Sequence, residues 1–530
     1  MLHTIQLKLL PVQAASESYI KEVICTSLHV KSIYQYSIIK KSIDARSSPI
    51  WVNLTVQVQL TKLLTNNNFE LPIQTFTTVK KTAKQVIIIG AGPAGLFAAL
   101  QLIQLGIKPI VIDRGVDVRS RRRHLAELNK SGILNEESNY CYGEGGAGTY
   151  SDGKLYTRST KRGNVQRILQ LFVQFGAADT ILYEAHPHIG TNKLPQIITA
   201  IRACIESCGG EVLFTKKLTD LNILNGTITS IKTSDGDTLT ANAYILATGH
   251  SARDIYELLH KKNIQISAKP FALGVRVEHP QALIDSMQYK CTIRNALLPP
   301  ASYSLVQQVQ GRGVFSFCMC PGGIVAAAST ANNELVVNGW SPSKRNNLYA
   351  NSGMVVSLDV NDLKGLKNYT TYFNNENTQQ SPLALLNFQK IVEQKAYVAG
   401  GGKFVAPAQR LVDYVQHKVS TNLPTNSYIP GTSSANLHEV LPPFISQRLA
   451  NALQQFGKTM KGYYTNDAIL IATESRTSSP VSIPRNKETL QHPQLSNLYP
   501  CGEGAGYAGG IVSACIDGEN CAKAIAAILL

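Results

Sequence analysis

The feature that most constrains the fold of this chain is a glycine-rich turn inside residues 86–113. Residues 86–89 are all Val or Ile, Gly90–Gly95 has the spacing G-x-G-x-x-G, an apolar stretch follows, and a second apolar run ends at Asp113. In a strand–turn–helix–strand unit, the first glycine permits a tight turn, the second lets backbone approach a pyrophosphate, and the third lets the helix pack on the strand. The N–H groups at the start of that helix attract phosphate. The segment therefore predicts a dinucleotide site, with Asp113 placed to bind the ribose.

Two later segments favour FAD over NAD as the dinucleotide. Residues 243–249 form an apolar run ending in Thr248-Gly249, which is typical of a strand that stops at the cofactor edge of a sheet. Near the C-terminus, residues 497–514 combine a short apolar run, Glu503 in a glycine-rich turn, and a helix start. The Glu503 carboxylate can accept hydrogen bonds from ribityl hydroxyls, and the helix N-terminus can face the flavin edge that becomes negative on reduction. We therefore expect FAD.

Further blocks of sequence support a family resemblance. They lie at residues 143–155, 249–254, 317–323, 406–410 and 474–480. Together with the segments above, they resemble the signature blocks of a largely uncharacterised bacterial family of FAD-dependent dehydrogenases, within the glutathione-reductase-like FAD superfamily. The resemblance spans residues 1–530 and implies a flavin fold and FAD binding, but it implies no substrate. Many relatives in the superfamily carry Glu where this chain carries Asp113, and either acid reaches a ribose hydroxyl.

The chain divides into three predicted parts. Residues 1–84 predict a small N-terminal α+β domain and a polar linker, and a ferredoxin-like fold is one interpretation of this domain. Residues 85–265 and 465–530 predict a discontinuous FAD-binding domain of the α/β class, Rossmann-like, with three layers around a parallel sheet. Residues 266–464 lie between them and predict an inserted, mixed α+β substrate domain. Because no second G-x-G-x-x-G follows a strand and opens a helix, we expect no separate NAD(P)H domain.

A second glycine-rich loop is expected at the cofactor. Residues 143–154 contain five glycines with Asp152 and Lys154, and close backbone approach to a flavin or pyrophosphate would explain them, although a purely structural loop is the alternative. The residues that we expect to bind the cofactor are Gly90, Gly92, Pro93, Ala94, Gly95, Asp113, Arg114, Gly146, Ala147, Gly148, Asp152, Lys154, Thr248, Gly249, Gly502, Glu503, Gly510 and Ile511.

Three polar side chains are candidates for the chemistry. His250 and Arg253 follow the turn after the strand at 243–247, and Arg476 precedes the C-terminal motif. Histidine can act as an acid or a base at neutral pH, and arginine can orient a carboxylate through two hydrogen bonds. A hydrogen-bonded loop histidine and an internal ion pair of Arg476 are the structural alternatives. Together with Cys318, these residues are expected to line a substrate pocket between the flavin and the inserted domain.

The cysteines and histidines do not predict a metal site. The chain has ten cysteines and no C-x-x-C pair. Cys318 and Cys320 are the closest approach to a redox pair, and two small residues on a strand are the alternative interpretation. Glu184, His186 and His188 lack a fourth ligand, so we expect no metal. Scattered thiols suit a reducing cytoplasm.

The net charge of +16 indicates anionic partners or substrates, but the charge is spread along the chain. The densest basic cluster, at residues 119–124, lacks the interleaved aromatic side chains that stack on bases. Nucleic acid is therefore not expected as a partner. No apolar run reaches the roughly 18 residues of a membrane span, and the first residues lack the pattern of a signal peptide. We expect a cytoplasmic protein.

These observations predict an FAD-dependent oxidoreductase. It would move a hydride between flavin and an unidentified small-molecule substrate, with an unknown electron donor or acceptor, while a side chain such as His250 moves the proton. The basic charge keeps a tRNA-modifying flavoprotein as an alternative, and a non-catalytic flavin-binding protein is a third interpretation.

Overall fold

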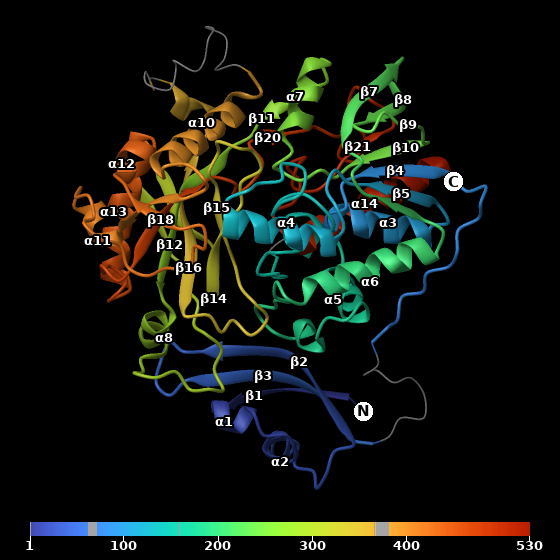
Figure 1. Cartoon of the computed structure of the whole chain (residues 1–530). Coiled ribbons are helices and arrows are strands. Elements are labelled where there is room, and N and C mark those ends of the chain that lie inside the picture. The colour runs from blue at the N-terminus through green and yellow to red at the C-terminus, as the bar shows by residue number, and fades with distance from the viewer. Residues whose placement is uncertain (1, 62–70, 158–159, 365, 367–380) are drawn as a thin grey trace.

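The computed structural model describes residues 2–61, 71–157, 160–364, 366 and 381–530. The chain forms a small N-terminal unit, drawn in dark blue at the bottom of Figure 1, an α/β domain on the right and a second α+β domain on the left (Figure 1). Within the described ranges, we find no helix with the length and apolar character that a membrane crossing requires.

The N-terminal unit is an antiparallel sheet with two helices on one face. Its elements are β1 (Leu2–Leu9), α1 (Pro11–Ala14), α2 (Glu17–Leu28), β2 (Gln35–Asp44) and β3 (Trp51–Gln59). The strand order is β1-β3-β2. Alternate residues of β3 from Val52 to Val58 are buried, since side chains alternate across a strand. This split β-α-β arrangement is part of a ferredoxin-like unit, and within residues 2–61 neither the helix nor the fourth strand that would follow β3 in that fold is present.

The α/β domain is built on a parallel sheet, as predicted, and this sheet has five strands. Its strands, in spatial order, are β21 (Leu498–Pro500), β10 (Ala243–Leu246), β4 (Gln85–Ile89), β5 (Lys108–Ile112) and β6 (Glu211–Leu213). The helices packed against one face are α3 (Pro93–Gln104), α5 (Val165–Gln174), α6 (Leu194–Ser207) and α14 (Ile511–Leu529). The elements packed against the other are β7 (Leu218–Leu224), β8 (Thr227–Thr233), β9 (Thr238–Leu239) and α7 (Arg253–Lys261). Both faces are buried, which explains the continuous apolar runs in the strands.

The second domain is built on a larger, mostly antiparallel sheet. Its path runs β13 (Val306–Val309), β14 (Arg312–Ala327), β16 (Tyr349–Leu358), β12 (Phe271–Pro280), β19 (Ile469–Glu474), β17 (Ala406–Arg410) and β18 (Thr432–Ser434), and β15 (Val337–Trp340) pairs with β14. The helices that share its apolar core are α8 (Gln281–Tyr289), α10 (Ala384–Ala399), α11 (Leu411–Val415), α12 (Leu437–Val440) and α13 (Pro443–Thr459). Nothing in the described part of this domain repeats the parallel dinucleotide-binding sheet.

Strand β19 corrects the domain boundary that we predicted. The strand pairs with β12 and β17 in the second sheet, whereas the boundary at residue 465 assigned it to the FAD-binding domain. A short apolar run looks the same in either sheet, and only its pairing distinguishes them. The chain returns to the α/β domain through β20 (Val481–Ser482), which pairs with β11 (Ser267–Ala268).

The packing of α14 on α3 gives a test of the fold. A Cβ atom at Gly518 would lie 2.0 Å from the carbonyl oxygen of Ala94, and backbone cannot move aside as a flexible side chain can. We expect Gly518→Ala to lower the free energy of unfolding by about 1–3 kcal/mol, the usual cost of overpacking, as measured by urea unfolding. Gly509→Ala is the control, because a Cβ there meets no atom within 4 Å. An equal loss in both variants would contradict the steric explanation.

Candidate cofactor and substrate site

A cavity of about 360 Å³ lies at the carboxyl ends of the parallel strands, which is where open α/β sheets bind their ligands. The α/β domain supplies most of its wall. The second domain contributes Phe317, Cys318, Cys320, Asn338 and Gly339. The cavity is therefore shared between the two domains.

The turn after β4 borders the cavity with its backbone. A Cβ at Gly90 would lie 2.4 Å from the carbonyl oxygen of Ala247, and a Cβ at Gly95 would lie 2.0 Å from that of Gly90. Because Gly90 and Gly95 have no side chain, their backbone can pack directly against the backbone of neighbouring segments. A Cβ at Gly92 would meet no atom nearer than 3.8 Å, so the space beside Gly92 is free for a ligand.

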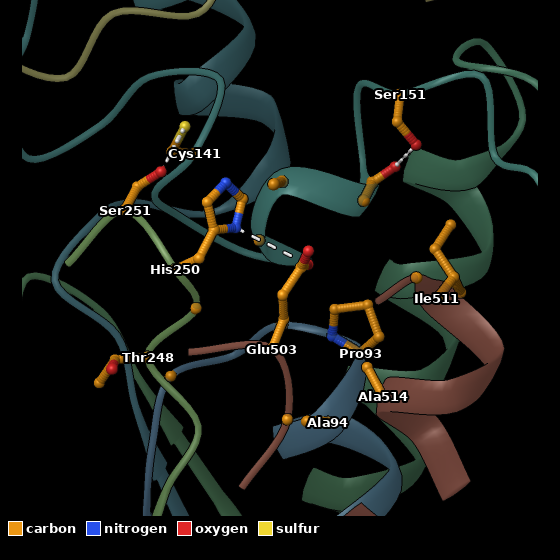
Figure 2. Close-up of a pocket in the computed structure, with 18 of the residues that line it drawn as sticks. Pro93, Ala94, Cys141, Ser151, Thr248, His250, Ser251, Glu503, Ile511 and Ala514 are labelled. Atoms are coloured by element: carbon orange, nitrogen blue, oxygen red, sulfur yellow. Dashed lines mark hydrogen bonds and ion pairs between the residues drawn. The ribbon is translucent and has the colours of Figure 1, made fainter. Parts of the chain in front are cut away.

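Two helices begin at this cavity. Helix α3 starts after Gly92 and α14 starts after Gly510, and neither helix has a side-chain hydrogen bond capping its N-terminus. Uncapped N–H groups and the positive end of the helix dipole favour negative charge. Figure 2 shows Pro93 and Ile511, the first residues of the two helices, near each other, and both line the cavity. The arrangement suits a ligand that is anionic at two points.

Glu503 lies beside Pro93, on the side toward His250 (Figure 2). Its carboxylate accepts no side-chain hydrogen bond from any described residue, and its one ion-pair contact there is with His250, whose Nδ1 lies 3.7 Å from Oε2. The Glu503 side chain is 27% exposed. A carboxylate at the wall of a cavity whose oxygens accept no hydrogen bond from the protein can accept hydrogen bonds from the hydroxyls of a ligand.

The Asp113 carboxylate accepts several hydrogen bonds from backbone N–H groups, which we did not predict. Its carboxylate accepts hydrogen bonds from the N–H groups of Ala91 (2.9 Å), Gly115 (2.8 Å) and Gly143 (3.1 Å). A carboxylate has about four lone-pair sites, so about one remains for a ribose hydroxyl. Asp113 therefore joins the first glycine-rich turn to the second loop, in addition to any contact with the cofactor.

Arg121 stabilises the start of the loop at residues 143–154 through hydrogen bonds to backbone carbonyl groups. This residue lies in α4 (Val118–Ser131), is 0% exposed, and donates hydrogen bonds of 2.8 Å to the carbonyl oxygens of Asn139 and Glu144. Carbonyl groups away from water need such donors. One member of the basic cluster at 119–124 is thus a buried structural residue.

Asp152 and Lys154, at the end of this loop, connect it to the second domain. Asp152 forms an ion pair with Arg345 at 2.7 Å. Burial alone would raise the pKa of Asp152, but the charge of Arg345 outweighs it and holds the pKa below its usual value. Lys154 donates through Nζ to the backbone carbonyl of Met319. Both residues line the cavity, and both also hold the two domains together.

Arg253 corrects one of the catalytic assignments, because it does not line the cavity. It is the first residue of α7, and its guanidinium donates to Glu334 and Glu393 of the second domain, both at 2.7 Å. A buried guanidinium needs carboxylate partners, and these lie away from the cavity. Arg253 is a structural residue at the domain interface.

His250 and Arg476 do line the cavity. The His250 side chain is 13% exposed, and burial lowers its pKa while the charge of Glu503 opposes this shift. The imidazole is therefore neutral at pH 7. Two hydrogen bonds hold the Arg476 guanidinium in place. Its Nη2 donates to the Glu393 carboxylate at 3.0 Å, and its Nη1 donates to the Thr330 hydroxyl at 2.7 Å. The internal ion pair expected as an alternative for Arg476 is present.

The structure brings most of the predicted cofactor residues to one wall. All of them except Gly95 line the cavity, and Gly95 is turned toward the backbone of Gly90 instead. Their contact with the cofactor itself stays a prediction. Cys141 and Tyr142 also line the cavity and were not predicted, although they directly precede the predicted loop. Asn338 and Gly339 were not predicted either, because they carry no motif and reach the cavity only because β15 pairs with β14.

One group of described residues has the composition of a metal site. The ligand atoms of Cys501, Asp517 and Cys521 lie within 4.8 Å of one another. Arg485 pairs with Asp517 at 2.6 Å and lies 3.5 Å from the Cys521 sulfur, so a guanidinium already supplies the positive charge there. Among the described residues, Glu184 and the two histidines after it form no such group. That the chain binds no metal stays a prediction.

Family models match successive parts of the chain. Residues 84–265 match a pyridine nucleotide-disulphide oxidoreductase model, residues 270–477 match the model of an FAD-dependent protein, C-terminal domain-like, and residues 1–59 match a domain of unknown function. The second match includes β19, in agreement with its pairing. An uncharacterised protein of Clostridium beijerinckii is 40% identical over 525 residues, which cover 96% of this chain and 95% of that protein.

Solved structures with similar folds are more distant. They include 2,6-dihydroxypyridine-3-hydroxylase from Arthrobacter nicotinovorans (10% identity, TM-score 0.37, 84% of each chain). CtdE in complex with FAD has 9% identity and a TM-score of 0.31 over 84% of each chain. These scores are too low to carry an argument about function. The family models confirm FAD as the cofactor and an oxidoreductase class, and they do not favour the RNA-modifying or non-catalytic alternatives.

Glu503 gives a test of the site. In Glu503→Gln the amide oxygen is a weaker acceptor than the carboxylate, and a hydrogen bond to a charged group contributes about 1.5–3 kcal/mol. We expect the Kd for FAD to rise by roughly 10–100-fold, as measured by titrating the apoprotein and following flavin fluorescence. Glu257→Gln, at an exposed acid of α7 outside the cavity, should leave the Kd unchanged. A normal Kd in Glu503→Gln would place the flavin elsewhere.

The lowered pKa of His250 predicts a pH dependence of stability. Below about pH 6.5, His250 binds a proton in the unfolded chain more readily than in the folded chain. The contribution of His250 to the free energy of unfolding is therefore fully present above that pH and declines as the pH falls. Urea unfolding at pH 7.5 and pH 5.5 should show a smaller acid-side loss in His250→Gln than in the wild type. His260→Gln, at an exposed position of α7, should lose as much as the wild type; equal losses in all three proteins would contradict the burial of His250.

Proposed function

We propose, on the premise that this chain belongs to the same family as its uncharacterised Clostridium beijerinckii relative and matches a model of FAD-dependent proteins, that it is a dehydrogenase acting on a small polar or anionic substrate. The observation that carries the proposal is the shared cavity. One wall holds Glu503 and two helix N-termini, and the opposite domain adds the side chains around Cys318.

The cofactor-binding part of the proposal is supported by complementary groups along this wall. The N-terminus of α3 beside Gly92 would hold the pyrophosphate, and Glu503 would accept hydrogen bonds from the ribityl chain. The N-terminus of α14 would stabilise negative charge at the ring. When bound, FAD supplies a two-electron acceptor that takes a hydride.

His250 and Arg476 would act on the substrate. A neutral imidazole with a lowered pKa can accept a proton as the hydride leaves. A guanidinium has five N–H donors, of which Nε, Nη1 and Nη2 each donate once to Glu393 or Thr330. About two donors of Arg476 are left to bind a carboxylate or another polar group in the cavity.

The electron partner and the compartment belong to the same proposal. The second domain has an antiparallel sheet where an NAD(P)H domain would have a parallel one, so we propose that electrons do not come from a dedicated nicotinamide site in the described part of the chain. The ten cysteines are all free thiols, which suits the cytoplasm.

Anaerobic bleaching of the flavin by a panel of metabolites tests this proposal. We expect bleaching by one or more small carboxylates or polar alcohols. With that substrate, Arg476→Lys should raise KM by about 10-fold or more because two directed donors are lost, and His250→Gln should lower kcat by about 10²–10⁴ because general-base catalysis is lost. Lys523→Gln, on an exposed part of α14, is the control. A substrate that bleaches the flavin equally fast in all variants would refute both roles.

A further inference from the structure

Two thiols, those of Cys318 and Cys320, lie on the part of the cavity wall that the second domain contributes. They belong to β14 at an irregularity in its pairing with β16. Phe317 pairs with Gly353 and Cys320 pairs with Asn351, so two residues of β14 stand opposite one residue of β16. This is the geometry of a β-bulge, which redirects side chains at functional sites. The Cys318 side chain is exposed to the cavity, which it lines.

The two cysteines lie close together in β14. The Cys320 thiol donates to the carbonyl oxygen of Cys318 at 3.2 Å, so the Cys320 sulfur lies against the backbone of Cys318. Two residues along a chain are separated by at most about 6.6–7.2 Å between Cα atoms. A disulfide takes Cα separations of about 4.4–6.8 Å, so the spacing of the two cysteines along the chain is compatible with a bridge.

Two cationic side chains donate hydrogen bonds to the backbone of residues 318–319. Arg276 donates through Nη2 to the carbonyl oxygen of Cys318 at 2.7 Å, and the same nitrogen lies 3.5 Å from the Cys320 sulfur. Lys154 donates to the carbonyl oxygen of Met319. Positive charge beside a thiol stabilises the thiolate, which is the reactive form. Separation from bulk water inside the cavity acts in the opposite direction and raises the pKa of Cys318 to about 11, and burial also raises the pKa of Cys320.

We propose that Cys318 and Cys320 form a redox-active dithiol that exchanges electrons with the FAD. The inference rests on the proposed function, because it requires FAD in the shared cavity. Two S–H bonds break and one S–S bond forms, and the pair gives up two electrons and two protons. Oxidised FAD takes up both electrons and both protons and becomes FADH₂. In the reverse direction, FADH₂ reduces the disulfide, so the pair stores a second pair of electrons beside the cofactor.

Anaerobic titration of the air-oxidised holoprotein with dithionite tests the inference. A flavin alone takes up two electrons, and a disulfide takes up two more. We expect four electrons per FAD in the wild type and two in Cys318→Ser and in Cys320→Ser. Cys25→Ser, in α2 of the N-terminal unit, should still take up four. An uptake of two electrons per FAD by the wild type would overturn the inference.

Mass spectrometry of the wild type gives an independent readout that needs no variant. Cleavage after Arg312 and Lys344 releases a peptide that contains Cys318 and Cys320 and no other cysteine. After oxidation by the bound FAD under anaerobic conditions, this peptide should be two hydrogen atoms lighter and resist alkylation, and dithionite should restore two alkylatable thiols. Two alkylated thiols before and after oxidation would overturn the inference and leave the proposed function standing. A protein that binds no FAD would overturn both.

Discussion

The shared cavity depends on a buried cluster of four charges where the two domains meet. Arg253 of the α/β domain donates to Glu334 and Glu393 of the second domain, and Arg476 donates to Glu393. Glu393 is 0% exposed, and despite its burial the two arginines hold its pKa well below its usual value. Two positive and two negative charges cancel, and removal of any one would leave an unpaired charge away from water. This requirement fixes how the second domain closes over the strand ends.

With the domains fixed in this way, the two walls of the cavity differ in chemistry. The α/β wall offers backbone N–H groups and the carboxylate of Glu503, which suit phosphates and hydroxyls. The opposite wall offers two thiols and the amide of Asn338. Arg476 also lines the cavity and lies on the segment that carries the chain from one domain to the other, whereas His250 follows β10 of the α/β domain. A cofactor on the first wall would therefore face reactive groups on the second.

The local parts of this arrangement could be predicted from the sequence, and the long-range parts could not. The spacing of Gly90, Gly92 and Gly95 is a local signal, because all three glycines lie within one turn of the chain, although the backbone that Gly90 packs against belongs to the distant Ala247. Glu503 was also found from its own turn. The roles of Arg253 and Asp113 depend on partners far along the chain, namely Glu393 and the Gly143 amide. No local pattern reports such partners, and the same holds for β19, whose sheet is decided by pairing alone.

Hydrogen exchange, compared between the apoprotein and the FAD-loaded protein, tests most directly whether the cofactor occupies a cavity made by both domains. The account predicts slower exchange on loading in three separate segments: the turn at 90–95, the start of α14 after Gly510, and the bulge of β14 at 317–320. Protection of the first two segments with no change at the bulge would contradict a cofactor enclosed between the domains. Absence of protection at all three would contradict the site itself.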